Sequence, residues 1–91
     1  MRMAVLDGGA FSSREELHAG LAESLQLPEW YGGNLDALAD CLGDLCEETE
    51  LRICRSGLLR ERLGDYALRL FGLLRGQAEE NSRLSVIIEE D

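Results

Sequence analysis

Three aspartates recur at intervals of four residues near the middle of the sequence, at Asp36, Asp40 and Asp44. Residues four apart lie on one face of an α-helix, so this spacing would align the three carboxylates along one helical edge. Neighbouring carboxylates can transfer protons, ligate a cation or pair with the basic groups of a partner. Ligands in a line form no cage for a metal ion, and nothing in the nearby sequence indicates a cleft that would raise a carboxyl pKa. Pairing with basic groups is the chemistry that fits this pattern.

This acidic edge lowers the stability of the helix that carries it. Each pair of like charges four residues apart is destabilising by roughly 0.2–0.5 kcal/mol. Ten acidic residues and no lysine or arginine lie between Arg14 and Arg52, so no basic neighbour in sequence offsets them. Such a helix either faces a positively charged partner or presents an acidic face to water, and the charge pattern alone leaves both interpretations open.

The helix that must hold these aspartates is predicted from Asn34 to Asp44. Asn34 is a favourable N-cap, because its side-chain oxygen can accept a backbone N–H of the first turn. On the side opposite the aspartates, the helical period places a stripe of leucines that we expect to be buried: Leu35, Leu38, Leu42 and Leu45.

A loop with two aromatic residues and two glycines, Trp30-Tyr31-Gly32-Gly33, leads into this helix. The aromatics either plug the space under the loop or contact a partner, since Trp and Tyr are enriched as anchors at interfaces. For Trp30 the interface interpretation is favoured, and for Tyr31 the two interpretations are balanced. His18, in the helix that precedes the loop, is interpreted as a partly exposed residue with a structural hydrogen bond.

The remaining pattern predicts alternating strands and helices. Helices are expected from near Ser13 to Pro28, from a Ser56 cap to Gly64, and from an Asp65 cap to residues 81–82. Short apolar runs predict strands at residues 3–6, 51–55 and 84–88. Strands separated by helical crossovers are expected to be parallel. The predicted fold class is therefore α/β, a small three-stranded parallel sheet with about four helices, in a single domain over residues 1–91.

Composition narrows the choice of partner. The chain of 91 residues carries 18 acidic residues against nine arginines and no lysine, for a net charge of −9. This charge disfavours direct binding to nucleic acid or to an anionic membrane, and it favours a basic protein. No apolar run approaches the roughly 20 residues of a membrane span, and the N-terminus does not resemble a signal peptide, so we expect a cytoplasmic protein.

The cysteines and glycines give no indication of a cofactor or an enzyme. Cys41, Cys46 and Cys54 lack C-x-x-C spacing, and His18 is the single histidine, so neither a zinc site nor any other metal site is expected. Cys41 flanks the leucine stripe and is interpreted as a small buried hydrophobe. No phosphate-binding glycine pattern or nucleophile elbow occurs. We expect no cofactor and no enzymatic activity.

One stretch resembles a known family. The run Leu27-Pro28-x-x-Tyr31-Gly32-x-Asn34-Leu35-Asp36-Ala37-Leu38-x-Asp40-Cys41-Leu42 closely resembles the barstar family of ribonuclease inhibitors. Weaker similarity at Leu17-His18 and in the last strand extends it over nearly the whole chain. The resemblance implies a barstar-like domain that is monomeric when free and inhibits a small, basic, secreted-type ribonuclease. The acidic helix and the aromatic loop would occlude the nuclease active site, with carboxylates in the places of RNA phosphates.

The resemblance also assigns partner-binding positions. Asp40 matches the family's central aspartate, and Asp36 matches a second acidic contact. Trp30 stands where the best-known member has a contacting tyrosine. The other positions implied to line the interface are Tyr31, Asn34, Leu35, Ala39 and Asp44. Ala39 replaces a tryptophan of that member, Asp44 replaces a small residue, and Gly76 replaces a contacting glutamate in the last helix, for which Glu79 or Glu80 would be the substitute.

Two other functions fit the same sequence. The scaffold would serve as an adaptor if its acidic face bound a basic protein that is not a nuclease. It would serve as a nucleic-acid mimic if the same face blocked a nucleic-acid-binding protein.

Overall fold

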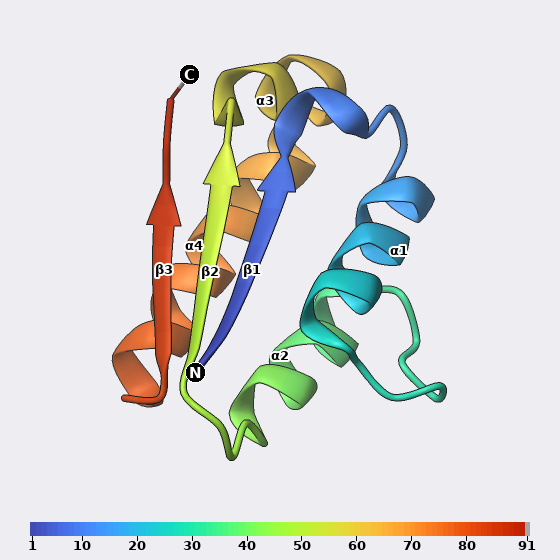
Figure 1. Ribbon diagram of the computed structural model, residues 1–91. Helices are drawn as coiled ribbons and strands as arrows, with labels where there is room; N and C mark the ends of the chain where they lie inside the picture. The colour runs from blue at the N-terminus through green and yellow to red at the C-terminus, as the bar shows by residue number, and fades with distance from the viewer. Residues whose placement is uncertain (91) are drawn as a thin grey trace.

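A computed structural model describes residues 1–90, which form three strands and four α-helices. In chain order these are β1 (Arg2–Asp7), the short 3-10 helix η1 (Gly8–Ala10), α1 (Arg14–Leu25), α2 (Leu35–Gly43), β2 (Thr49–Cys54), α3 (Ser56–Leu63), α4 (Asp65–Glu80) and β3 (Leu84–Ile88). The predicted α/β class, with a three-stranded parallel sheet and four helices, is confirmed (Figure 1).

The sheet has the order β1-β2-β3, and both pairs of strands are parallel. Along the central strand β2, buried Thr49, Leu51 and Ile53 alternate with half-buried residues. This alternation is typical of a sheet with one covered face. α4 lies behind that covered face (Figure 1) and α1 packs against β1, while exposed Met3 and Val5 of β1 lie on the other face.

Leucines supply most of the core between the sheet and the helices. α1 buries the predicted face of Leu17, Leu21 and Leu25, and α1 packs on β1. α4 buries the predicted face of Ala67, Leu70, Phe71 and Leu74, and it packs against α2, α3 and β3. The aspartate-bearing helix α2 is therefore held mainly by α4 and not by the sheet.

Several predicted boundaries are wrong, and backbone conformation explains those of α1 and α3. α1 ends at Leu25 instead of at Pro28, because Gln26 takes a left-handed conformation (φ 53°) and the amide of Leu27 donates to the carbonyl of Ala22. Left-handed Arg55 precedes α3, so Ser56 is the first helical residue and not the cap. α4 is preceded by Gly64 rather than capped by Asp65. β2 begins at Thr49, two residues before the predicted start.

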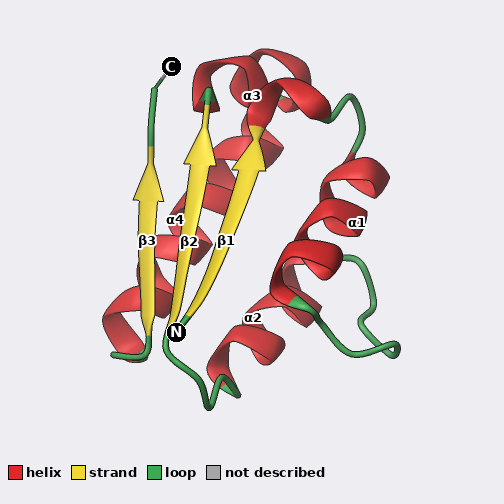
Figure 2. Cartoon of the chain, in the orientation of Figure 1, coloured by secondary structure: helices red, strands yellow, loops and turns green. Residues whose placement is uncertain are grey.

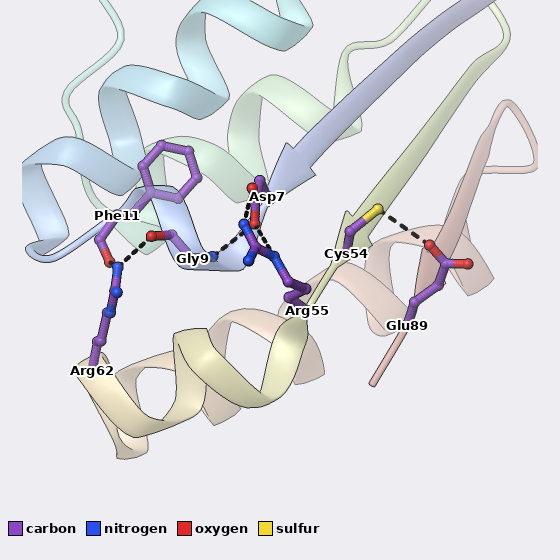
Figure 3. Close-up of polar contacts among 7 residues, drawn as sticks. All are labelled: Asp7, Gly9, Phe11, Cys54, Arg55, Arg62 and Glu89. Atoms are coloured by element: carbon purple, nitrogen blue, oxygen red, sulfur yellow. Dashed lines mark hydrogen bonds and ion pairs between the residues drawn. The ribbon is translucent and has the colours of Figure 1, made fainter. Parts of the chain in front are cut away.

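The carboxyl end of the sheet is closed by contacts within the chain (Figure 3). Arg55 pairs with Asp7 at the end of β1, and Arg62 of α3 donates to the carbonyls of Gly9 and Phe11. Open α/β sheets commonly bind ligands at this end. In this protein helix α2, which carries the aspartates, runs toward the opposite end, where the strands begin (Figure 1).

Candidate partner-binding surface

Local sequence and packing fix the orientation of α2. Asn34 is the N-cap as predicted, and its side-chain oxygen accepts the amide of Ala37 at 2.8 Å. Leu38 and Leu42 are fully buried, and Leu35 is half-buried against the core. The side-chain amide of Asn81, just after α4, donates to the carbonyl of Leu42 at 3.1 Å. The two ends of α2 are thus each held by an asparagine. Leu45 packs on the core from beyond the end of the helix.

The three aspartates face water, as the helical spacing predicts. Asp36 and Asp40 are exposed on α2, and exposed Asp44 is its C-cap. Within residues 1–90, arginines form ion pairs with Asp7, Glu47, Glu50, Glu89 and Glu90, but with none of these three aspartates. Three carboxylates on one edge are therefore free to pair with another molecule.

Two arginines lie near Asp36 without pairing with it. Arg14 of α1 and Arg69 of α4 line a hollow of about 440 Å³ together with Asn34 and Asp36. The guanidinium of Arg14 lies 4.3 Å from the ring centroid of Tyr66, which holds it over that ring. The acidic edge therefore has a basic margin at its N-terminal end, which the sequence reading missed because both arginines are distant in sequence.

The two aromatic residues of the loop before α2 lie in different environments. It runs outside α1 and α2 (Figure 2), and Trp30 on it is 70% exposed and absent from the hydrophobic core. Tyr31 is half-buried, and its hydroxyl is hydrogen-bonded to His18. Gly33 follows with a φ of 70°, a left-handed conformation that favours glycine. The structure therefore makes Tyr31 a plug under the loop, while its role in binding stays a prediction.

His18 holds this loop against the helices. It is 3% exposed, so the prediction of a partly exposed residue is wrong, although the predicted structural hydrogen bond is present. Its Nδ1 is hydrogen-bonded to the hydroxyl of Tyr31, and its Nε2 lies 2.6 Å from the hydroxyl of Tyr66 on α4. Burial lowers the pKa of His18 below its usual 6.5, and the nearby Glu15 opposes this only in part. Burial likewise raises the pKa of Tyr31, and Tyr66 adds to that effect.

The structure also shows where the positions that depart from the family pattern lie. Ala39 is half-buried on α2, and Gly76 is exposed on α4 with open space where a Cβ would lie. Glu79 and Glu80 are exposed in the last turn of α4. Since α4 packs against α2, these residues belong to the helix that supports the acidic edge.

The structure adds no support for a metal site, a reactive cysteine or a membrane-spanning helix within residues 1–90. In the part of the chain that the structure describes, no three His, Cys, Asp or Glu side chains come together as a metal site would require. Cys41 is buried as predicted, Cys46 is exposed, and Cys54 donates to Glu89 at 3.2 Å (Figure 3). Burial raises the pKa of the Cys41 thiol, which makes it a poor nucleophile. None of the helices within residues 1–90 has the length and apolar character that crossing a membrane requires.

Comparison with known proteins agrees with this arrangement. Residues 1–89 match the family described as Barstar (barnase inhibitor). A protein of Bacillus subtilis (strain 168), named "Putative ribonuclease inhibitor YrdF", is 50% identical over 91 residues, covering 98% of this chain and 100% of that protein. The family description names an inhibitor, in agreement with the expectation that the chain is not an enzyme. The fold, the motif before and within α2, and these matches together show that the chain belongs to the Barstar (barnase inhibitor) family.

Proposed function

We propose that this protein inhibits a small basic ribonuclease by placing α2 and the loop around Trp30 in the nuclease active site. The observation that carries the proposal is the set of three exposed aspartates, Asp36, Asp40 and Asp44, none of which pairs with an arginine within residues 1–90. Family membership and the name of the Bacillus relative support the same target class.

The mechanism is occlusion. A ribonuclease active site binds phosphates with arginine, lysine and histidine side chains, and carboxylates accept the same charge-assisted hydrogen bonds. The carboxylates of α2 would take the places of RNA phosphates, with Asp40 at the centre of the edge. Because α2 is capped, buried on its leucine side and tied to α4, little conformational entropy is lost when it docks.

The test is a titration of a panel of small basic ribonucleases with the purified protein. Inhibition predicts loss of RNA cleavage that reaches completion at one equivalent of protein for at least one nuclease. A panel in which every nuclease keeps its activity would contradict the proposal and favour an adaptor that binds another basic protein. Release of a DNA-binding protein from its operator by this protein would instead favour the nucleic-acid mimic.

We also propose that the protein acts in the cytoplasm, where it would protect the producing cell from the nuclease before secretion. The net charge of −9 favours capture of a basic enzyme at low protein concentration. Fractionation of the source cells, with detection of the protein by antibody, tests this location.

A further inference from the structure

A small hollow lies where the end of α1, the loop and the end of α2 meet. It measures about 180 Å³, less than the roughly 300–1,000 Å³ of a typical small-molecule site. Its size suits a single side chain of another protein. Four apolar residues, Leu25, Leu27, Pro28 and Leu45, line it together with Gln26, Trp30, Cys41 and Asp44.

The lining combines three properties that together select a particular side chain. Leucine and proline surfaces accept an apolar stem. An indole ring attracts a cation placed over its face, and a carboxylate pairs with one. Trp30 is 70% exposed and Asp44 is exposed and unpaired within residues 1–90, so both remain available.

The position of Asp44 at the end of α2 strengthens the preference for a cation. Asp44 is the C-cap, and its backbone N–H bonds to the carbonyls of Cys41 and Leu42. The C-terminus of a helix carries partial negative charge, so a carboxylate there adds to a potential that is already unfavourable for an anion. A bound cation would offset the negative charge of the Asp44 carboxylate and of the helix C-terminus. No basic residue in the last turn of α2 does so already.

We propose that this hollow receives an arginine side chain of the partner ribonuclease, with the guanidinium between the Trp30 indole and the Asp44 carboxylate. Arginine fits better than lysine because its planar head can stack on an aromatic ring while it donates to a carboxylate. The proposal rests on the proposed function and adds a second recognition element to it, at the opposite end of the acidic edge from Asn34.

The first experiment uses an arginine derivative instead of a nuclease, so it tests the hollow whether or not the protein proves to be an inhibitor. Nα-acetyl-arginine-N-methylamide is titrated at constant ionic strength, and the indole N–H of Trp30 and the amide of Asp44 are followed by NMR. We expect saturable shifts of both signals, and no saturation with the citrulline derivative, which has the same shape without the charge. Equal responses to the two derivatives, or shifts confined to other residues, would overturn the proposal.

The second experiment uses a ribonuclease that the protein inhibits. Asp44→Asn should raise the dissociation constant about tenfold, which is the size expected for one charged contact. Glu23→Gln is the matched control, since it removes the same charge from an exposed residue of α1 that does not line the hollow. Wild-type affinity in Asp44→Asn would overturn this inference while leaving the inhibitor function intact. Equal weakening by Glu23→Gln would also overturn it, because a general charge effect would then suffice.

Discussion

At the scale of single residues, the acids of this protein fall into two groups. Five of them pair with arginines between elements or along the sheet, as Asp7 does with Arg55 and Glu47 does with Arg2. The aspartates of α2 belong to the other group, because they face water without a basic partner within residues 1–90. Residues of the first group make contacts within the fold, whereas removal of one from the second should act mainly on what the surface binds and relieve some repulsion along α2.

Asp40→Asn should leave folding unchanged and weaken binding of the target nuclease. Removing one member of a charge pair that is buried in an interface costs about 2–5 kcal/mol or more. Isothermal titration calorimetry measures the loss, and thermal melts check the fold. Glu61→Gln is the control and should bind as the parent does, because Glu61 is an exposed residue of α3, which lies at the other end of the molecule from α2 (Figure 1). Unchanged binding by Asp40→Asn would remove Asp40 from the interface.

His18 should make stability depend on pH. Its pKa in the folded protein is lowered by burial, so as pH falls the unfolded chain, with its usual pKa of 6.5, binds the proton before the folded chain does. Stability linked to His18 is therefore fully present above that pH and is lost as pH falls below it. Urea melts between about pH 5 and 8 measure this dependence. The difference in stability between the parent and His18→Gln should shrink toward acidic pH, and a constant difference would contradict the prediction.

Residue-level prediction from sequence succeeded where the determinants are local. The Asn34 cap and the outward direction of Asp36 and Asp40 depend on neighbours within one or two helical turns. The contact between His18 and Tyr66 joins residues 48 apart in sequence, and no periodicity predicts such a pair. The signal available in the sequence was the position of His18 beside the buried face of α1, because a buried imidazole requires polar hydrogen-bond partners from elsewhere in the chain.

At the scale of elements, α2 owes its orientation to the leucines on its inner side. Leu38 and Leu42 have no exposed surface, whereas Leu35 at the start of the helix is half-buried. Because α2 packs against α4 and is linked to it by Asn81, the leucines decide which edge faces outward. The acidic edge and the hydrophobic side are thus two consequences of one helical pattern.

Leu38→Ala should destabilise the protein by roughly 2–5 kcal/mol, the usual cost of a cavity at a fully buried leucine. Leu35→Ala is the matched comparison and should cost less, since part of that side chain already contacts water. Chemical denaturation of both variants measures the two losses. Equal losses, or a Leu38→Ala variant as stable as the parent, would mean that α2 is rotated relative to this description.

Element boundaries were predictable only where side chains define them. The predicted bounds of β3 are those observed, because an apolar run is enclosed by polar residues. The end of α1 and the start of α3 were missed, since Gln26 and Arg55 adopt left-handed conformations that their side chains do not favour. The chain around them imposes these conformations, so composition alone could not reveal them.

At the scale of the whole molecule, negative charge is the dominant property. The net charge of −9 is spread over a protein with a Cα radius of gyration of 11.9 Å, and the free aspartates concentrate part of it at one end. A basic partner would be steered toward that end before contact. The fold class and the acidic helix were predictable from the sequence, whereas the basic margin at Arg14 and Arg69 required the structure.

The association rate with the target nuclease should fall steeply as salt concentration rises, because ions screen the long-range attraction. The dissociation rate should change much less, since it depends on short-range contacts. Stopped-flow fluorescence at increasing sodium chloride concentrations, with exposed Trp30 as the probe, measures both rates. An association rate that is insensitive to salt would contradict electrostatic steering.

The bond from Asn81 to the carbonyl of Leu42 has a consequence for synthesis on the ribosome. The donor follows the acceptor by 39 residues, and β3 comes later still. The acidic helix α2 therefore leaves the ribosome well before the residues that hold it in place have been synthesised. If the protein is a nuclease inhibitor, as proposed, inhibition would begin only when translation of the domain is nearly finished, so fragments that end before Asn81 should carry the motif but leave the nuclease active.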